Sequence, residues 1–393
     1  MALQTPTSLS KPTATSAESP AVLLCLSHLR WNFVFQRPQH LLTRAAKTHT
    51  VLYVEEPVYE KISRPAMRTA EPAPGLRVLT PVLPEGTSAP QAIHMQRALL
   101  NSTLAAINYD RLVLWYYTPM ALPFSDHLEY DVCVYDCMDE LSAFKNAPRE
   151  LVQMERLLMQ RADVVFTGGQ SIYEAKRRLH KSIYPFPSSI DVAHFHKARK
   201  PASDPADQAE IPHPRVGFAG VIDERLDVAL LAATAARMPD VQFVMIGPVV
   251  KIDPADLPRL PNIHWLGGKT YSELPAYMSN WDMGWMPFAL NDATRYISPT
   301  KTPEFLAAGL PVVSTAIVDV VRSYGAQGLV QIADAEDMEE KIREGLGNPK
   351  DLLRKSVDAY LANMSWDKTW SAMSSHLSRV SRPHVETTLR VGA

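Results

Sequence analysis

A single stretch in the second half of the chain combines turn, helix and strand signals around polar side chains. Ser298–Thr315 reads SPTKTPEFLAAGLPVVST. This order predicts a short helix capped by Ser298 or Thr302, a stop at Gly309 and a buried strand that begins at Pro311. The start of such a helix offers free backbone N–H groups and the positive end of the helix dipole. The stretch therefore predicts a binding site for an anion such as phosphate.

The side chains around this helix start add chemistry suited to a nucleotide sugar. Lys301 supplies a mobile cation, and Ser298 and Thr300 supply hydroxyls. Glu304 lies just inside the helix, where a carboxylate can accept hydrogen bonds from sugar hydroxyls. The alternative is an ordinary capped α/β connection with a solvated lysine and glutamate.

A glycine-containing turn earlier in the same half is a second candidate for phosphate binding. Gly217–Arg225 reads GFAGVIDER, and its glycines, Gly220 among them, follow a strand and let the backbone approach a phosphate closely. Arg225 can form paired hydrogen bonds with a diphosphate. Asp223 and Glu224 either orient that arginine or are solvated, and we favour solvation. The alternative for the whole turn is a plain strand-to-helix connection with an exposed arginine.

Two segments of the first half place polar or aromatic side chains after strands. Trp115, Tyr116 and Tyr117 come at a strand's carboxyl end, where ligands bind in open α/β sheets. Their rings predict stacking on a sugar or another acceptor, and core packing is the alternative. Asp136 and Asp139 follow the next strand, and both could face a cleft. A cap for the helix predicted to follow is the alternative for Asp139, and it is the interpretation that its position favours slightly.

The loop after the first strand holds a histidine and an arginine. His28 is the histidine at a strand end that could act as an acid or base. Arg37, in QRPQH, precedes a predicted helix and could contact an anion or the acceptor. A surface arginine is the alternative for Arg37.

The pattern K-x-x-E-[FY]-L-A-A-G-x-P-V-V resembles the donor-site helix of GT-B glycosyltransferases, especially the retaining family 4 group. This resemblance implies that Glu304 binds the ribose of the nucleotide. Many members carry a second glutamate eight positions earlier, where this chain has Tyr296. Family 4 enzymes often have a histidine near the position of Asp139, and this chain has none there. We therefore treat Asp139 as a substitute candidate for contact with the transferred sugar.

The resemblance extends to the turns that hold the nucleotide. It implies that the turn at Gly247 forms part of the base pocket, with Lys251 more readily interpreted as a surface lysine. The family's glycine loop usually supplies two basic residues, of which Arg225 can be one, whereas Val221 lies near the position of the other. GT-B enzymes generally need no divalent metal, so we expect no metal site and no cofactor beyond the sugar-nucleotide co-substrate.

The periodicity of the chain predicts βα units in both halves. Continuous apolar runs of strand length alternate with amphipathic segments, which indicates parallel sheets covered by helices on both faces. In the first half we expect strands at 21–27, 50–56, 77–83, 112–117, 132–135 and 164–167 and a helix at 91–107. In the second we expect strands at 215–221, 241–247, 262–267, 282–288 and 329–333.

These patterns predict an α/β protein of GT-B architecture, with two doubly wound, Rossmann-like domains facing a cleft. Residues 1–20 read as a disordered tail, 21–200 as an acceptor domain and 211–365 as a nucleotide-sugar donor domain. A linker rich in proline, alanine and charge joins the domains. By resemblance, a last helix over 366–385 crosses back to the first domain.

The composition fits a globular protein in a reducing compartment. Of the 393 residues 46% are hydrophobic and 21% charged, and the net charge of −2 gives no reason to expect a nucleic-acid partner. Three cysteines are too few for a disulfide scaffold, and we expect buried thiols. No apolar run approaches about 20 residues. We therefore expect a cytoplasmic protein, with contact to the inner face of a membrane left open and its oligomeric state undetermined.

The resulting prediction is a hexosyltransferase-type enzyme. It would move a sugar from a UDP- or GDP-sugar to a saccharide or lipid-linked acceptor, with retention and without metal, in cell-envelope polysaccharide or glycolipid synthesis. A GT-B sugar-nucleotide epimerase and a catalytically silent GT-B partner subunit are the alternatives. A Rossmann oxidoreductase is disfavoured because no G-x-G-x-x-G follows the first strand.

Overall fold

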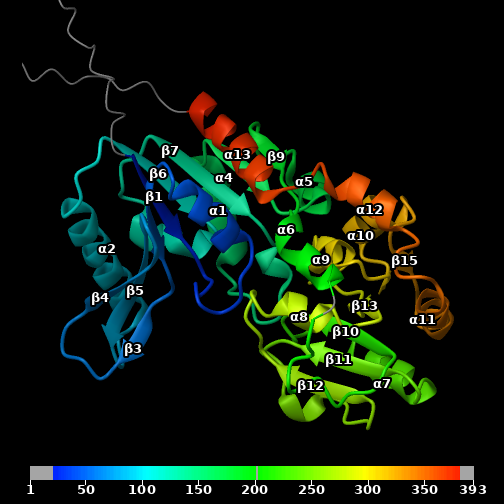
Figure 1. Ribbon diagram of the computed structural model, residues 1–393. Helices are drawn as coiled ribbons and strands as arrows, with labels where there is room; N and C mark the ends of the chain where they lie inside the picture. The colour runs from blue at the N-terminus through cyan, green and yellow to red at the C-terminus, as the bar shows by residue number, and fades with distance from the viewer. Residues whose placement is uncertain (1–20, 201, 381–393) are drawn as a thin grey trace, which may run out of the picture.

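The computed structural model describes residues 21–200 and 202–380, which form two α/β domains joined at one side (Figure 1). The expected N-terminal tail and residues 381–385 of the expected last helix lie outside the described residues. Throughout the part of the chain that is described, no helix has the length and apolar character needed to cross a bilayer.

The first domain is built on a nine-stranded sheet in the order β3-β5-β2-β1-β6-β7-β8-β9, with β4 paired to β5. All these pairs are parallel except β4–β5. The central strands are apolar runs buried on both faces, as expected for a sheet with helices on either side. The strands are β1 Ala21–Leu26, β2 Thr50–Val54, β3 Val58–Glu60, β4 Ala66–Ala73, β5 Leu76–Pro84, β6 Arg111–Tyr116, β7 Val132–Cys137, β8 Val164–Thr167 and β9 Ile183–Pro185.

Helices cover this sheet at positions that the periodicity largely predicted. The expected helix over 91–107 is confirmed as α2, and the apolar face of Leu41, Leu42 and Ala45 is buried in α1. The edge strands β3, β4 and β9 have no counterpart among the predictions. The helices are α1 Arg37–Ala45, α2 Ala89–Ala105, α3 Leu122–Ser125, α4 Leu151–Arg161, α5 Gln170–Lys176 and α6 Val192–Phe195.

The second domain is built on a six-stranded parallel sheet in the order β12-β11-β10-β13-β14-β15. Its core is a single cluster rich in methionine, tryptophan and β-branched residues. The strands are β10 Arg215–Ala219, β11 Gln242–Ile246, β12 Ile263–Gly267, β13 Met283–Met286, β14 Val312–Ser314 and β15 Gln331–Ile332. The helices are α7 Val228–Arg237, α8 Leu274–Met278, α9 Lys301–Ala308, α10 Val318–Val320, α11 Met338–Gly347 and α12 Arg354–Leu361.

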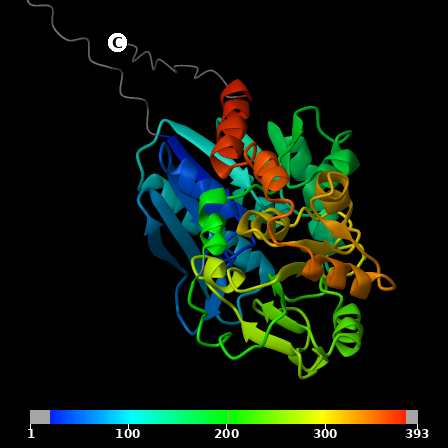
Figure 2. The ribbon, with the colours of Figure 1, turned by 45° about the vertical axis from the view of Figure 1, so that its right-hand side comes forward.

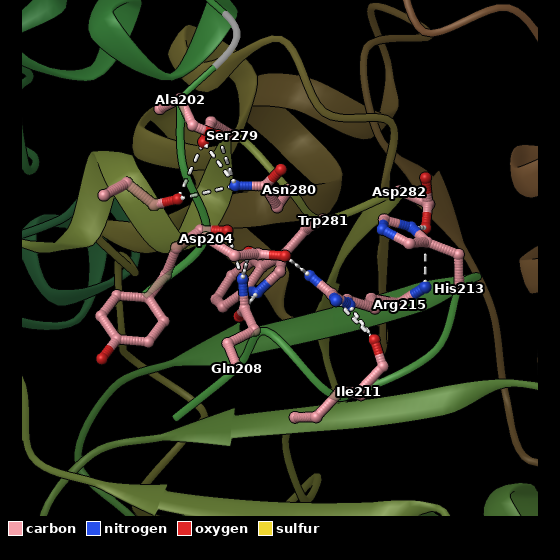
Figure 3. Close-up of polar contacts among 12 residues, drawn as sticks. Ala202, Asp204, Gln208, Ile211, His213, Arg215, Ser279, Asn280, Trp281 and Asp282 are labelled. Carbon is pink, nitrogen blue, oxygen red and sulfur yellow. Dashed lines mark hydrogen bonds and ion pairs between the residues drawn. The ribbon is translucent and has the colours of Figure 1, made fainter. Parts of the chain in front are cut away.

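The segment that reads as a linker is anchored to the second domain through buried polar contacts (Figure 3). Gln208 is fully buried and accepts a hydrogen bond from the Trp281 indole at 2.8 Å. Asp204 forms an ion pair of 2.8 Å with Arg215, at the start of β10. Over residues 202–214 this segment contains turns but no helix or strand, and backbone turn bonds hold it together with the side-chain contacts.

The last described helix, α13 (Trp366–Val380), lies beside the first domain (Figures 1 and 2). It contacts α1 and β8, and Trp366, Met373 and Leu377 belong to a core cluster otherwise made of first-domain residues. His40 of α1 stacks on Trp366 with ring centroids 4.5 Å apart. The chain thus returns to the domain in which it began.

Candidate functional site

A cleft of about 880 Å³ lies at the carboxyl ends of the strands, between the two domains. Ligands of open α/β sheets bind at this edge. The cleft is lined from the first domain by 31–37, Gln39, Met138, Asp139, Gly168 and Ser188. From the second domain it is lined by 218–221, Arg225, 246–248, 268–274, Phe288 and 297–301.

The expected helix after the SPTK turn is α9, which ends at Gly309 with a left-handed φ of 87° as predicted. The predicted caps are wrong: the N-cap is Thr300, and no side chain accepts a hydrogen bond from the first turn. Thr302 lies within the helix and directs its hydroxyl to the Met286 sulfur at 3.4 Å. The Thr302 N–H donates to the Pro299 carbonyl at 3.4 Å, and Pro303 has no N–H. An anion in the cleft would therefore meet the N–H groups of Thr300 and Lys301, beside the side chains of Ser298, Thr300 and Lys301 that line the cleft.

Lys301 and Glu304 form an ion pair of 2.6 Å within the first turn of α9. Glu304 is only 5% exposed. Burial raises the pKa of its carboxyl, and the Lys301 ammonium opposes that rise. Lys301 lines the cleft, whereas Glu304 lies behind it and is not among the lining residues. The role of Glu304 toward a ribose stays a prediction.

The glycine turn after β10 presents Gly220, Val221 and Arg225 to the cleft. The solvated interpretation of its acidic neighbours is wrong. Asp223 is 2% exposed and holds the Arg225 guanidinium through contacts of 2.7 to 3.2 Å. Both carboxylate oxygens of Glu224 are buried and have no hydrogen-bond partner in the part of the chain that the structure describes. Arg225 is therefore oriented by a buried carboxylate, with its own charge neutralised.

The turn after β11, which contains Gly247, packs against the glycine turn after β10. The φ of Gly247 is +152°, and a methyl group added there would lie 1.7 Å from the carbonyl oxygen of Gly220. The Gly220 N–H donates to Ile246 at 2.9 Å. These two glycine turns therefore pack backbone to backbone on the wall of the cleft, which requires glycine at position 247.

Lys251 is an exposed surface lysine, as the sequence favoured, and its side chain contacts the first domain. Its ammonium nitrogen lies 4.7 Å from the ring centroid of Phe144, a residue of the first domain. The Arg225 guanidinium lies 5.5 Å from the same centroid. Two cations of the second domain thus contact one aromatic ring across the domain boundary.

Arg37 has a structural partner that the sequence did not reveal. Its guanidinium forms hydrogen bonds of 2.8 to 3.1 Å with Asp136 and one of 2.6 Å with the Phe186 carbonyl. Arg37 and Asp136 are 2% and 0% exposed. This buried pair corrects the alternative of a surface arginine and the expectation that Asp136 faces the cleft. Arg37 borders the cleft, and its contact with an anion or the acceptor stays a prediction.

Asp139 lines the cleft, as the sequence predicted, and does not cap the following turn, Leu141–Ala143. Burial raises the pKa of its carboxyl, and the charges of Arg225, Arg37 and Lys251 oppose this rise. Two cations of the second domain, Arg225 and Lys251, thus join Arg37 of helix α1 in the surroundings of a single carboxylate.

His28 is a poor match for acid or base chemistry at neutral pH. Burial, followed by the charge of Lys251, lowers its pKa from 6.5 to about 4. Its Nδ1 atom is buried and has no hydrogen-bond partner among residues 21–200 and 202–380, and the residue is not among those that line the cleft. The ring is therefore neutral at pH 7, whereas efficient proton transfer favours a pKa near the working pH.

The predicted aromatic acceptor contacts are wrong, because all three rings belong to the core. Trp115 and Tyr116 are 0% exposed and Tyr117 is 1% exposed. Strand β6 is central in the sheet, so helices cover both of its faces and leave no ring free for a sugar.

Other aromatic residues line the cleft instead. Phe33 and Phe35, from the loop after β1, are 44% and 40% exposed. Phe35 stacks on Tyr271 of the second domain at 4.5 Å. The available sequence signal was their position in an aromatic loop, WNFVF, directly after the first strand. Tyr296, where relatives of the motif carry a glutamate, packs instead against the first domain's core cluster.

Comparisons with known proteins agree with the two-domain α/β fold described above. Residues 213–348 match the family model of Glycosyl transferases group 1. Sucrose-phosphate synthase from Thermosynechococcus elongatus superposes with a TM-score of 0.69 over 92% of this chain and 99% of its own, at 14% identity. The chain has the GT-B glycosyltransferase fold. The lipopolysaccharide glycosyltransferase WaaG shares this fold, with a TM-score of 0.60 over 91% of this chain and 99% of WaaG, at 15% identity.

In sequence, the chain is similar to a bacterial protein named for teichuronic acid biosynthesis. TuaH of Bacillus subtilis (strain 168), whose name assigns it to teichuronic acid biosynthesis as a glycosyltransferase, is 29% identical over 229 residues. The match covers 54% of this chain and 57% of TuaH, so it spans little more than half of either protein. An E. coli structure described as trehalose-6-phosphate bound with UDP-2-fluoro glucose also has this GT-B fold, with a TM-score of 0.66 over 91% of this chain and 99% of its own, at 11% identity.

Proposed function

We propose that the protein is a glycosyltransferase that uses a UDP- or GDP-sugar and acts in the synthesis of a cell-envelope polysaccharide or glycolipid. The observation that carries this proposal is the start of α9, which has no side-chain cap and opens with Lys301 into a cleft of about 880 Å³. The motif, the group 1 match and the similarity to TuaH support the same class.

The chemistry requires a sugar–oxygen bond to break while negative charge builds on the diphosphate leaving group. Lys301 and the α9 dipole would stabilise that charge from one side of the cleft. Arg225, held in place by Asp223, would act from the glycine turn opposite. Each such preorganised contact contributes about 3 kcal/mol to transition-state stabilisation. We propose that these groups take the role that a divalent metal has in other transferases.

The acceptor would enter from the first domain. Phe33 and Phe35 offer exposed aromatic faces for a sugar ring or a lipid-linked saccharide. Asp139 presents its carboxylate at the cleft, where it could hold a hydroxyl of the transferred sugar. We propose retention of anomeric configuration from the family 4-like motif, and a cytoplasmic location at the inner face of the membrane.

One observation favours a catalytically silent GT-B subunit as the second candidate. Tyr296 stands where the motif's second glutamate is expected, and its ring packs on the first domain rather than presenting a carboxylate to a sugar. Binding without turnover is the distinguishing property of such a subunit.

Two measurements test the function and separate the candidates. Calorimetry with UDP, GDP and a nicotinamide cofactor should show binding of one of the first two and none of the third. Radiolabelled donor, incubated with saccharide and lipid-linked acceptors, should then give labelled product. Binding without transfer would support the silent subunit, and conversion of the free sugar nucleotide would support an epimerase.

A further inference from the structure

We propose that Lys251 supplies the second cation for the donor's diphosphate, in place of the basic residue that the glycine turn lacks at Val221. This inference rests on the proposed function and assigns a residue to it. Lys251 lies in the loop after β11. The resemblance leads us to expect the second cation at Val221 instead, in the turn after β10.

The first argument is the balance of charge in the cleft. Each cationic residue that lines it already has a carboxylate partner: Arg37 with Asp136, Arg225 with Asp223, Lys269 with Asp207 and Lys301 with Glu304. A diphosphate that binds there meets cations that each already pair with a carboxylate. Lys251 differs, because within residues 21–200 and 202–380 no carboxylate forms an ion pair with it. An anion would therefore not have to compete with a paired carboxylate for its ammonium group.

The second argument is that the fold holds Lys251 beside the glycine turn. Ile222 and Val249 form a parallel bridge. The Ile222 N–H donates to Pro248, and the Val250 N–H donates back to Ile222, each at 3.0 Å. The loop that carries Lys251 is thereby joined to the turn that carries Arg225, so the two side chains keep a fixed relation.

The third argument is the backbone of Lys251 itself. Its φ is 62°, in the left-handed region that non-glycine residues avoid. Among the described residues, Asn146 is the one other non-glycine residue with a positive φ, and asparagine tolerates this conformation better than lysine does. Glycine would be less strained at position 251. We therefore expect a contact of the lysine side chain to offset the backbone strain.

The exposed side chain of Lys251 lies at the domain boundary, next to the residues that line the cleft rather than among them. Its ammonium lies 4.7 Å from the Phe144 ring centroid, and Arg225 contacts the same ring. The charge of Lys251 also helps to lower the pKa of His28 and opposes the burial-driven rise in the pKa of Asp139, which lines the cleft. A flexible lysine at this position can reach an anion bound between Arg225 and the start of α9.

The test compares Lys251→Gln with wild type in calorimetry, using UDP and GDP and their nucleosides uridine and guanosine. The charge-matched control is Lys355→Gln, which removes an exposed lysine from α12 outside the cleft. We expect Lys251→Gln to weaken binding of the diphosphate about tenfold, because a charge-assisted contact is lost. Nucleoside affinity should be unchanged, and Lys251→Arg should restore most of the loss.

The other possible outcomes would overturn either this role of Lys251 or the proposed function. Equal UDP or GDP affinity in Lys251→Gln and wild type would overturn the proposal, and so would an equal loss for diphosphate and nucleoside, which would indicate a structural role. A matching loss in Lys355→Gln would reduce the effect to overall charge and also overturn it. If wild type bound neither UDP nor GDP, the proposed function itself would fail, and this role of Lys251 with it.

Discussion

Asp319 of the second domain accepts a hydrogen bond from the backbone N–H of Ser171 in the first, with both carboxylate oxygens within 3.1 and 3.3 Å. Helix α5 begins after Gly169, which has no side chain to cap it, so the other domain supplies the cap. Arg322 adds an exposed ion pair of 2.9 Å with Glu174 on the same helix. The relative position of the domains, and thus the width of the cleft, depends on this contact.

Replacing Asp319 with alanine should therefore loosen the domain contact. Loss of a helix cap costs about 1 kcal/mol, which should appear as a lower free energy of unfolding. Small-angle scattering should show a larger radius of gyration. Glu174→Ala is the matched control, because an exposed ion pair contributes at most about 1 kcal/mol and often nothing measurable. An unchanged radius and stability in Asp319→Ala would show that the contact does not hold the domains together.

Gly247→Ala tests the backbone contact between the two glycine turns. The added methyl group would lie 1.7 Å from the Gly220 carbonyl oxygen, and φ of +152° is unfavourable for alanine. We expect loss of nucleotide binding together with a lower melting temperature. Gly347→Ala is a suitable control, because nothing lies within 4 Å of the corresponding methyl position. Normal nucleotide affinity in Gly247→Ala would remove this turn from the donor site.

Glu304→Gln tests the carboxylate behind the cleft without changing its size. We expect nucleotide-sugar affinity to fall about tenfold while the protein stays folded, since a charge-assisted contact is replaced by a neutral one. The free energy of unfolding, measured alongside by denaturant titration, separates a binding effect from a folding effect. Unchanged donor affinity would exclude Glu304 from the site.

Lys301→Ala should lower turnover more than affinity, because charge on the leaving group is greatest in the transition state. We expect kcat to fall on the order of a hundredfold with a small change in KM. The measurement is steady-state kinetics with labelled donor, with Lys355→Ala as the control. Equal losses in binding and turnover would make Lys301 a ground-state anchor.

The stability of the fold should decrease in mild acid because of His40. Burial lowers the pKa of this ring from 6.5 to about 3, ahead of the effects of Arg44 and Lys301. Below pH 6.5 the unfolded chain therefore binds a proton that the folded chain does not, and stability is lost as the pH falls. At about 1.4 kcal/mol per pH unit, this histidine costs about 2 kcal/mol at pH 5.

Denaturant titration of His40→Phe at pH 7 and pH 5 checks this expectation. The variant keeps an aromatic ring against Trp366 and should lose about 2 kcal/mol less stability than wild type between the two pH values. His94→Phe, which changes an exposed histidine on α2, should behave like wild type. An identical loss in His40→Phe and wild type would contradict the role of His40.

The sequence predicted the local structure well because each signal was local. The glycine stop of α9, the central strands and the amphipathic faces follow from a few neighbouring residues. The buried pair of Arg37 and Asp136 joins positions 99 residues apart, so local signals did not reveal that this guanidinium has a structural partner. The prediction for Trp115 failed for the same reason, because it depends on residues far apart in the sequence. The strand order places β6 in the centre of the sheet, where the ring of Trp115 is covered.

The candidate site was predictable in outline but not in its charge balance. The SPTK turn, the glycine turns and Asp139 all line the cleft, as their positions after strands suggested. Asp223 was misjudged because its burial depends on a tertiary contact with Arg225, and the contact of the exposed Lys251 with Phe144 was likewise beyond the reach of local signals.

The most direct test of the account is the structure of crystals soaked with UDP and, separately, with GDP. The account predicts a diphosphate whose oxygens lie within hydrogen-bond distance of the backbone N–H groups at the start of α9, beside Lys301. A nucleotide bound elsewhere, such as in the pocket of about 150 Å³ between Gly309 and Val357, with the start of α9 left empty, would contradict it.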